Sequence, residues 1–429
     1  MTKYMKRLID KDLKRYLNIM GAVLIVGPKW CGKTTTAEQF AKSTLKLQNP
    51  DNRESFLQLA EIKPSKLLEG KKPRLIDEWQ LAPVLWDAVR TSVDNLDGKG
   101  HYILTGSTVV NEDEIMHSGA GRIHRLLMYP MSLYESKDSN GKISLKELFE
   151  NNQVEIDGIE SDLTLEDIIH VSCRGGWPET LTIENPEDQL EISKSYVDVI
   201  CQFDVSNIDD VKRNPHKVKL LLQSYSRNIS TLAKNVNIIK DVNATYDNLD
   251  STSYYKYINA LKRLFVIDDI RGWAPNIRSK TVIRTGPKRQ FIDPSIATAS
   301  LNLTPKRLIY DLKTFGFIFE NLCIRDLKIY SQSLKGHIYY YRDKLNLEVD
   351  CIIQLDDGRY GLIEFKLGSK EEEKGAKNLL KLDKLIKEKI KQNQTKIPEP
   401  SFLAIINGGK FAYTREDGIK VIPIGCLKD

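Results

Sequence analysis

Short apolar runs alternate with amphipathic segments over the first third of the chain. Ala22 to Val26 is wholly apolar, and Arg74 to Asp77 and Tyr102 to Thr105 contain similar short runs. Such runs are typical of parallel strands covered on both faces, and the segments between them have helical spacing. We expect a helix from about Lys33 to Thr44 after the first strand. The alternation predicts a doubly wound α/β sheet over residues 1–135.

The pattern changes after this first domain. Residues 136–142 are polar and contain glycine, as expected of a linker, and helical spacing follows them. We therefore expect a helical lid or linker region over residues 136–210. Residues 211–305 combine short helices with the strand-like run Phe265 to Ile267 and a basic segment, which favours a winged-helix connector.

The last part of the chain predicts a further α/β domain over residues 306–429. It opens with a long helical pattern, about Pro305 to Tyr330. A Lys- and Glu-rich helix from Glu371 to Lys391 is expected to be a solvated face. Between these helices, alternating or apolar runs predict strands at His337 to Tyr341, Glu348 to Gln354 and Tyr360 to Phe365.

Composition narrows the class of protein. A length of 429 residues suggests two to four domains at roughly 100 to 200 residues each. Lys and Arg (64) exceed Asp and Glu (58) by 6, so any nucleic-acid surface must come from local clustering of basic groups. The six cysteines include no C-x-x-C pair, and no apolar run approaches the roughly 20 residues that span a bilayer. We expect a cytoplasmic protein without a membrane segment, and Met1 to Arg15 as a short amphipathic helix instead of a signal peptide.

A phosphate-binding loop follows the first predicted strand. The segment from Gly27 to Thr34 matches G-x-x-x-x-G-K-S/T between a buried strand and a helix, which is the context that this loop requires. Its backbone N–H groups and the helix N-terminus would bind phosphate oxygens, and Lys33 would reach the β- and γ-phosphates of ATP. The residues predicted to bind the nucleotide are Gly27, Pro28, Lys29, Trp30, Cys31, Gly32, Lys33, Thr34 and Thr35. A thiol at Cys31, beside bound nucleotide, can be reactive.

Two carboxylates end the next predicted strand. Asp77 and Glu78 would lie at the carboxyl edge of a parallel sheet, where such sheets bind ligands. Asp77, with the hydroxyl of Thr34, is predicted to hold Mg²⁺, and Glu78 to orient and polarise the attacking water. On a sequence without the phosphate-binding loop, an Asp-Glu pair would more often be an exposed turn.

Further candidates lie beyond the third predicted strand. Ser107 follows it and can sense the γ-phosphate, although a capping hydroxyl is the alternative. Arg122 follows a glycine-rich turn and can stabilise charge in the transition state, although a surface salt bridge is also open. If Arg122 acts on the nucleotide of a neighbouring copy, the protein is a homo-oligomer.

A second carboxylate constellation is predicted near the end of the chain. Glu320 lies on the long helix, Asp350 on one strand, and Glu364 and Lys366 on the next, which gives the pattern E, D, E-x-K. Carboxylates on adjacent strands can hold a divalent cation, and a lysine beside them can activate or stabilise an attacking water. Plain amphipathic strands also alternate acidic and apolar residues, so a domain that only binds is the alternative.

Several of these segments together resemble a known group. The chain is similar to prokaryotic AAA-type ATPases that are fused to a C-terminal domain of unknown function with a restriction-endonuclease-like fold. The resemblance implies an AAA core, a helical extension, a winged-helix-like connector and a nuclease-like end. It rests on Leu75–Pro83, Ile103–Ser107, His117–Arg122, Gly175–Pro178, Arg263–Val266 and Leu362–Gly368.

The function expected from the sequence is hydrolysis of ATP with Mg²⁺. DNA is the partner suggested by basic residues interleaved with aromatics between Tyr254 and Arg289, including Lys288, Arg278, Lys280, Arg284 and Trp273. A packing module is the other reading of that region. Two alternatives remain for the whole chain: an ATP-dependent nuclease that uses a second divalent cation, and a non-catalytic nucleotide switch that recruits a protein partner.

Overall fold

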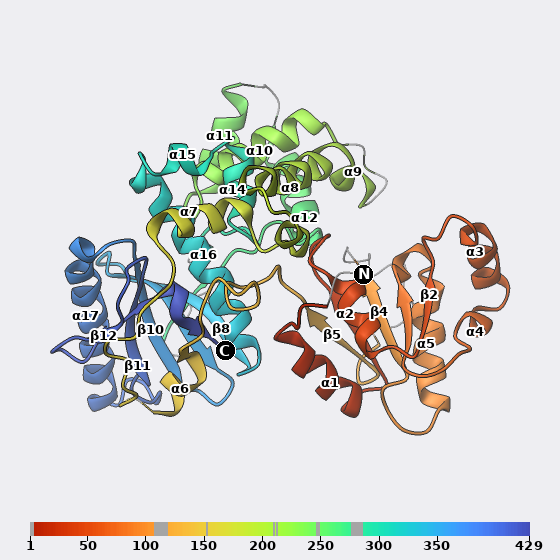
Figure 1. Ribbon diagram of the computed structural model, residues 1–429, viewed down its shortest axis with the longest axis horizontal. Helices are drawn as coiled ribbons and strands as arrows, with labels where there is room; N and C mark the ends of the chain where they lie inside the picture. Colours follow the sequence, from red (N-terminus) through yellow and green to blue (C-terminus); the bar gives the residue numbers. More distant parts are fainter. Residues whose placement is uncertain are drawn as a thin grey trace. The chain divides into compact units, whose positions relative to one another are not determined.

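The computed structural model describes residues 4–106, 119–151, 153–208, 211, 213–245, 249–275 and 286–429. Ser107, His117, Arg278, Lys280 and Arg284 lie outside them. The chain divides into two compact units, each drawn in Figure 1 in the colours of its sequence. We call Met1–Pro130 with Arg263–Phe265 the first unit, and Met131–Lys262 with Val266–Asp429 the second unit.

The first unit is built on a parallel sheet. Its described residues form five strands in the order β2-β3-β4-β1-β5, all parallel. One strand, β4, therefore separates β1, which precedes the predicted phosphate loop, from β3, which carries Asp77. The bounds are β1 (Ala22–Val26), β2 (Ser43–Lys46), β3 (Arg74–Asp77), β4 (Tyr102–Gly106) and β5 (Ile123–Leu127).

Helices cover both faces of this sheet, as a continuously apolar strand requires. Leu24 of β1 belongs to a core with Trp86, whereas its neighbour Ile25 belongs to a separate core with Leu13 and Ala37. Consecutive residues of one strand thus enter opposite cores. The bounds are α1 (Ile9–Ile19), α2 (Lys33–Phe40), α3 (Arg53–Ile62), α4 (Pro64–Leu67), η1 (Trp79–Leu81) and α5 (Val84–Asn95).

One element of the first unit differs from the sequence prediction. The helix expected as far as Thr44 ends at Phe40, and Ser43–Lys46 forms β2 instead. Ser43 aligns with Arg74 in the parallel ladder between β2 and β3. The β2 strand has only four residues, and its side chains are mostly exposed at the edge of the sheet, so it lacks the apolar run that marks the buried strands.

The second unit contains a mixed sheet. Its described residues form seven strands in the order β12-β13-β11-β10-β9-β8-β7, with antiparallel pairs β8-β9, β9-β10 and β12-β13. The three strands expected near its start are confirmed as β8, β9 and β10. The bounds are β7 (Arg271–Gly272), β8 (Gly336–Arg342), β9 (Glu348–Leu355), β10 (Tyr360–Lys366), β11 (Phe402–Asn407), β12 (Tyr413–Thr414) and β13 (Lys420–Pro423).

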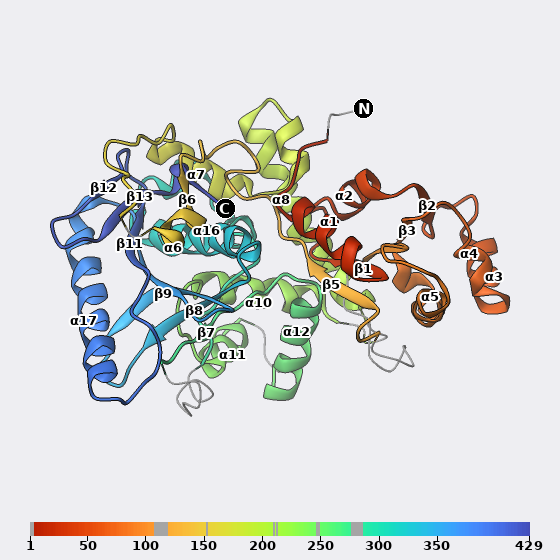
Figure 2. The same ribbon diagram turned by 90° about the horizontal axis from the view of Figure 1, so that it is seen from below.

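Two long helices lie on the two sides of this sheet (Figures 1 and 2). On one side α17 (Glu372–Lys391) buries Leu379, Leu382 and Ile386 in a core with the strands, and its lysines, such as Lys377 and Lys381, form the solvated opposite face. On the other side α16 (Leu312–Gln332) packs against β8 and β10.

The single long helix expected from about Pro305 is divided in the structure. A short helix α15 (Pro305–Leu308) comes first, and α16 begins after Asp311. The carboxylate of Asp311 accepts a hydrogen bond from the backbone N–H of Thr314 at 3.1 Å, which is an N-cap interaction. The side-chain cap therefore marks a new helix start inside the apolar-periodic segment.

Most of the remaining helices of the second unit come before α16 in the chain, whereas η5 (Ser369–Glu371) and η6 (Ile424–Cys426) follow it (Figure 1). After α12, the chain forms antiparallel bridges from Ile267 to Phe291 and from Ile270 to Lys288. A short parallel pair joins β6 (Ile143–Ser144) to β14 (Leu427–Lys428). The helices are α6 (Leu145–Glu150), α7 (Leu165–Arg174), η3 (Pro178–Thr182), α8 (Pro186–Val199), η4 (Ile200–Asp204), α9 (Val205–Asn207), α10 (Pro215–Arg227), α11 (Asn235–Asn243), α12 (Ser251–Arg263), α14 (Ser295–Ser300) and η6 (Ile424–Cys426).

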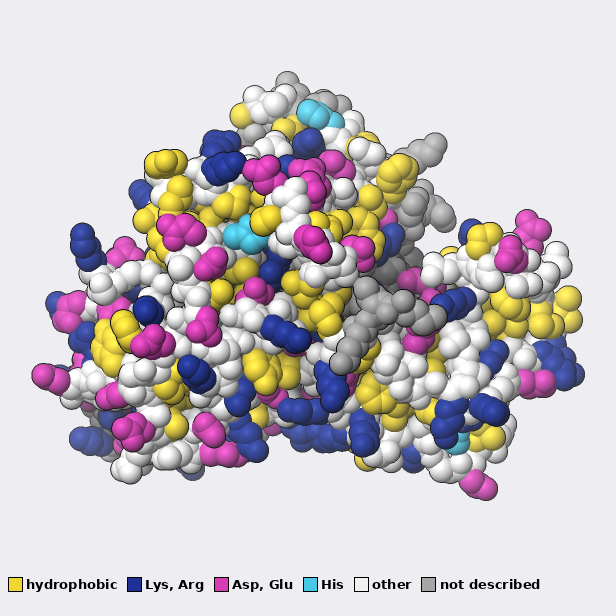
Figure 3. Space-filling model, viewed as in Figure 1, with side chains coloured by type: hydrophobic (Ala, Val, Ile, Leu, Met, Phe, Trp, Pro, Cys, Tyr) yellow, Lys and Arg dark blue, Asp and Glu magenta, His cyan; other side chains and the backbone are white. Residues whose placement is uncertain are grey.

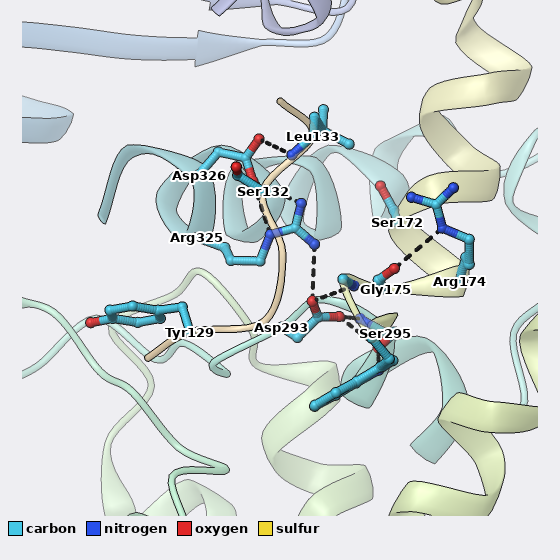
Figure 4. A network of polar contacts seen from close by, with 12 residues as sticks. Tyr129, Ser132, Leu133, Ser172, Arg174, Gly175, Asp293, Ser295, Arg325 and Asp326 are labelled. Carbon is cyan, nitrogen blue, oxygen red and sulfur yellow. Dashed lines mark hydrogen bonds and ion pairs between the residues drawn. The ribbon is translucent and has the colours of Figure 1, made fainter. Parts of the chain in front are cut away.

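A buried polar network holds distant segments of the second unit together (Figure 4). The guanidinium of Arg325 pairs with Asp293 at 2.9 Å and with Asp326 at 2.7 Å. Asp293 also accepts the backbone N–H of Gly176 at 2.9 Å, and Asp326 accepts that of Leu133 at 3.0 Å. Because these charges are fully buried, each depends on its partners for the solvation that it loses. The network therefore fixes the start of the second unit and the Gly175–Pro178 motif against α16.

The contact at Gly176 gives a prediction about stability. A Cβ at this position would lie 2.1 Å from the carbonyl oxygen of Met131, so Gly176→Ala must displace backbone. We expect it to lower the free energy of unfolding by about 1–3 kcal/mol or more, measured by denaturant unfolding.

The matched control is Gly316→Ala, within α16. A Cβ there meets no atom within 4 Å, and alanine in a helix should raise stability by about 0.5–1 kcal/mol. A Gly176→Ala chain as stable as the unmodified protein would contradict the close backbone packing at Met131.

Candidate functional site

The segment between β1 and α2 has the backbone that a phosphate loop needs. Gly27 and Gly32 have φ angles of 152° and 96°, and Gly32 is the N-cap of α2. A Cβ on Gly27 would lie 2.2 Å from the carbonyl oxygen of Met128, so this position excludes any side chain. Glycine is thus required at Gly27 both by its backbone angle and by the close approach of the chain after β5.

Lys33 is the buried cation of this loop. Only 6% of it is exposed, and its ammonium donates hydrogen bonds to the carbonyl oxygens of Gly27 at 3.0 Å and Pro28 at 2.7 Å. These carbonyls are neutral partners, so the positive charge is held inside the loop without a carboxylate. Such an ammonium can exchange carbonyl partners for phosphate oxygens.

Asp77 lies at the carboxyl edge of the sheet, in register with residues of the adjacent strands. It aligns with Thr105 of β4, which aligns in turn with Ile25 of β1. Its Oδ1 accepts hydrogen bonds from the hydroxyls of Thr34 and Thr105, each at 2.6 Å, and its Oδ2 accepts one from Gln48 at 3.4 Å. Among the described residues, Asp77 has only neutral donors and no ion-pair partner. A buried carboxylate without a counter-charge favours binding of a cation.

Glu78 follows Asp77 with a left-handed backbone, at φ 55°. Its carboxylate accepts a hydrogen bond from the side-chain amide of Gln80. A Cβ on Gly106 would lie 2.9 Å from the side-chain carbonyl oxygen of Gln80, so Gly106 leaves room for this amide. Gln80 therefore orients the carboxylate that the sequence predicts to position water.

Sequence reasoning missed the supporting residues of this edge. A hydroxyl at the strand end Thr105–Ser107 is predicted from the sequence as a sensor of the γ-phosphate, not as a donor to Asp77. The contacts of Gln80 and Arg7 are not predicted. Arg7 donates from its guanidinium to the carbonyl oxygens of Cys31 at 2.7 Å and Tyr129 at 2.8 Å. A polar residue ending a buried strand was an available signal for Thr105, whereas nothing local indicates that Arg7 reaches the loop.

The other predicted residues of the first unit are placed differently. Trp30 is 43% exposed and Thr35 is exposed, both on the surface of the loop and helix. Cys31 is buried, and its thiol lies 3.6 Å from the carbonyl oxygen of Met128. A reactive thiol at the nucleotide is therefore wrong for this conformation, because the side chain points into the core. Ser107 lies outside the described residues.

Arg122 lies on the surface after β4 and is not part of the row at the sheet edge. Its guanidinium pairs with Asp94 at 2.9 Å, and both side chains are more than one-third exposed. Such a pair contributes only about 0–1 kcal/mol, so it is easily exchanged for another anion.

The second unit brings the four predicted rear residues into one buried cluster. Lys366 pairs with Asp350 at 3.1 Å and with Glu364 at 2.5 Å. Glu320 does not contact Lys366; it pairs with Lys288 at 2.6 Å. Lys288 also lies 3.3 Å from Asp350, which makes it the second ammonium of the cluster.

Burial and pairing shift the acidities in this cluster. Burial raises the pKa of Glu320 to about 8 and, together with the nearby Asp350, raises that of Glu364 well above its usual range. Burial also opposes ionisation of Asp350, but the ammonium groups of Lys288 and Lys366 outweigh it and hold its pKa below the ordinary value. The pKa of Lys288 is raised, because its three carboxylate neighbours outweigh the opposing effect of burial. Asp350 is thus the stable anion of the cluster.

Part of the basic region expected to face nucleic acid is internal. Lys288 and Arg289 are buried, and so are Tyr254 and Trp273. Lys288 belongs to the carboxylate cluster, and Arg289 hydrogen-bonds Asn235 at 2.5 Å. These residues therefore cannot form the predicted phosphate-binding surface. On the second unit, the left part of Figure 3 shows basic side chains interspersed with acidic ones.

Neither a metal-ligand cluster nor a membrane-spanning helix is present among the described residues. No group of three or more His, Cys, Asp or Glu residues there has the arrangement of a metal site. No helix within the described ranges has the length and apolar character needed to cross a membrane.

Comparisons with known families divide the chain into three matched segments. Residues 20–137 match the family described as AAA domain. Residues 165–307 and 315–427 match two families described as Domain of unknown function (DUF8612) and Domain of unknown function (DUF4143). The phosphate loop, the parallel sheet and the first match together support an AAA-type P-loop ATPase domain.

Similar whole proteins carry no assigned activity. The chain is 22% identical over 366 residues to the uncharacterized proteins Rv2008c of Mycobacterium tuberculosis and Mb2031c of Mycobacterium bovis. Each alignment covers 81% of this chain and 71% of the relative. These relatives share much of the length of the chain but do not indicate what it does.

Solved structures include distant likenesses. The Walker-type ATPase PABY2304 of Pyrococcus abyssi is 13% identical, with a TM-score of 0.41 over 68% of this chain and 94% of that one. A STAND protein (Signal Transduction ATPase with Numerous Domains) with a tetratricopeptide repeat sensor, from Pyrococcus horikoshii, is 12% identical. Its TM-score is 0.21 over 78% of this chain and 49% of that one. At these TM-scores, neither likeness adds to what the geometry of the site supports.

Proposed function

We propose that the protein hydrolyses ATP to ADP and phosphate in its first unit. The observation that carries the proposal is the buried Asp77 carboxylate, which touches the Thr34 hydroxyl next to the phosphate loop and has no ion-pair partner within 4 Å among the described residues. Carboxylate and hydroxyl oxygens are the ligands that Mg²⁺ accepts alongside nucleotide phosphates. The residues at this edge therefore fit Mg-ATP.

Each residue has a separate role in the proposed reaction. Lys33 and the loop N–H groups bind the phosphates, and Thr34 and Asp77 would hold Mg²⁺. Bound Mg²⁺ would neutralise charge on the β- and γ-phosphates. Glu78, oriented by Gln80, accepts the proton of the attacking water. Thr105 keeps Asp77 in place through its hydroxyl.

The arrangement of the second unit supports a winged-helix-like connector. Helices α10, α11 and α12 are followed by the antiparallel bridges at Ile267 and Ile270, the order in which such units place three helices and a hairpin. DNA as a partner rests on the remaining exposed basic residues Lys256, Lys262 and Arg271. A cytoplasmic location and the bounds of the four domains stay predictions from the sequence.

Two substitutions test the proposed roles separately. Lys33→Ala should weaken ATP binding by about 10- to 100-fold, because it removes a charged hydrogen-bond donor from the phosphates. Glu78→Gln should retain ATP but slow hydrolysis by about 10²- to 10⁴-fold, because water activation is lost. Calorimetry gives the affinities, and phosphate release gives the rates, with and without duplex DNA.

The control for lost charge is Lys42→Ala, an exposed lysine that follows α2. Unchanged ATP affinity in Lys33→Ala would contradict the site. An unmodified chain that binds ATP but releases no phosphate, even with DNA, would favour the non-catalytic nucleotide switch.

A second prediction concerns Arg122. If it acts on the nucleotide of a neighbouring copy, turnover per chain should rise with protein concentration, and Arg122→Ala should lower turnover without weakening ATP binding. Arginines in this role contribute about 10³- to 10⁵-fold in rate. The matched control is Asp94→Asn, which breaks the ion pair but keeps the guanidinium, so its turnover should not fall. Turnover independent of concentration in a chain that stays monomeric with ATP would exclude the role in trans.

A further inference from the structure

The side chain of Lys288 ends inside the carboxylate cluster of the second unit. Only 2% of this side chain is exposed, and its ammonium lies 2.6 Å from Glu320, 3.3 Å from Asp350 and 3.4 Å from Glu348. The three carboxylates come from α16 and from two positions of β9, whereas Lys288 comes from the chain before α14. The lysine is therefore brought to them by the tertiary fold.

The backbone of Lys288 is held in place. Its N–H donates to the carbonyl oxygen of Ile270 at 2.9 Å, and its carbonyl accepts from the N–H of Ile270 at 3.1 Å. Two residues earlier, the carbonyl of Gly286 accepts a hydrogen bond from the hydroxyl of Tyr340 on β8. These backbone hydrogen bonds fix the point from which the buried Lys288 side chain enters the cluster.

Both oxygens of Asp350 face an ammonium. Oδ1 lies 3.3 Å from Lys288, and Oδ2 lies 3.1 Å from Lys366 while also accepting the N–H of Phe365 at 3.1 Å. Glu364 is likewise occupied, by Lys366 at 2.5 Å and by Asn378 at 3.3 Å. The oxygens of Asp350 and Glu364 thus have partners, whereas Glu320 Oε1 lies 2.6 Å from the Lys288 ammonium without a well-directed hydrogen bond.

A divalent cation does not fit this arrangement. It would need several of these oxygens at about 2.0–2.6 Å, which is inside the space that the two ammonium groups share with them. It would also meet two positive charges within a few ångströms, where the low dielectric of the interior makes repulsion strong. The cluster therefore differs from Asp77, whose hydrogen-bond donors among the described residues are all neutral.

We propose that Lys288 takes the place of a divalent cation in this cluster, so that the folded second unit does not bind Mg²⁺ or Mn²⁺ there. The ammonium is a built-in counter-ion that keeps the constellation of Glu320, Asp350 and Glu364 closed to metal. On this proposal the expected second cation has no place in the cluster, and no metal-dependent cleavage of nucleic acid follows from the cluster in this state. The inference does not depend on ATP hydrolysis.

The test measures binding of Mn²⁺ by electron paramagnetic resonance without nucleotide. All chains carry Asp77→Asn, which removes the carboxylate of the first unit. With Lys288 intact, we expect no Mn²⁺ bound at the cluster. Lys288→Met removes the charge and leaves an unbranched side chain of similar length. It should bind Mn²⁺ at least about tenfold more tightly than the chain with Lys288 intact. Adding Asp350→Asn should abolish that gain.

The matched control is Lys288→Arg, which keeps the positive charge and should bind no Mn²⁺. A gain in binding should also appear as a Mn²⁺-dependent rise in the melting temperature of Lys288→Met. The proposal is overturned if the chain with Lys288 intact binds Mn²⁺ and loses it with Asp350→Asn. That arm needs no substitution of Lys288, so it decides the question even if Lys288→Met does not fold. A folded Lys288→Met chain that gains no Mn²⁺ would overturn it equally.

Discussion

A carboxylate that leaves water must receive its solvation from the protein, and this constraint organises the interior of both units. The first unit buries Asp77 against the hydroxyls of Thr34 and Thr105. The second unit buries Asp350 between two ammonium groups, and pairs Asp293 with the guanidinium of Arg325. Neutral donors leave a carboxylate negative, whereas cationic donors balance it. The kind of donor therefore decides which of these carboxylates can recruit a cation from solution.

The difference between neutral and cationic donors also separates the proposed ATP site of the first unit from the buried network of the second unit. At the edge of the parallel sheet, Lys33 is kept from Asp77 by its bonds to the loop carbonyls, so phosphate and cation can each find an oppositely charged partner. Around Arg325, the guanidinium pairs with the carboxylates of Asp293 and Asp326. This network connects the start of the second unit to α16 (Figure 4). Such a network favours one arrangement of the segments over others, because breaking it leaves a charge buried alone.

The sequence predicted those features of the fold and the site that depend on residues close together in the chain. The phosphate loop and the Asp77–Glu78 pair follow apolar runs, so their place at strand ends could be read from spacing alone. The strands β8, β9 and β10 were predicted for the same reason. The edge strand β2 was missed because its side chains are largely exposed, and the break before α16 was missed because Asp311 caps a helix within a continuous helical pattern.

Contacts between distant residues could not be read in this way. Lys288 was interpreted as part of a basic surface, because its neighbours in sequence are basic and its partners lie about 30 to 60 positions away, on α16 and β9. Arg7 reaches the phosphate loop across 24 positions, and Thr105 reaches Asp77 across 28. Charge at a position is visible in the sequence, but its burial is decided by the fold.

The most direct measurement is the number of Mn²⁺ ions bound per chain at saturating ATP, counted by electron paramagnetic resonance in the unmodified protein. The contrast between neutral and cationic donors predicts a single ion, bound with the nucleotide and lost in Asp77→Asn. A second ion that persists in Asp77→Asn and is lost in Asp350→Asn would contradict it.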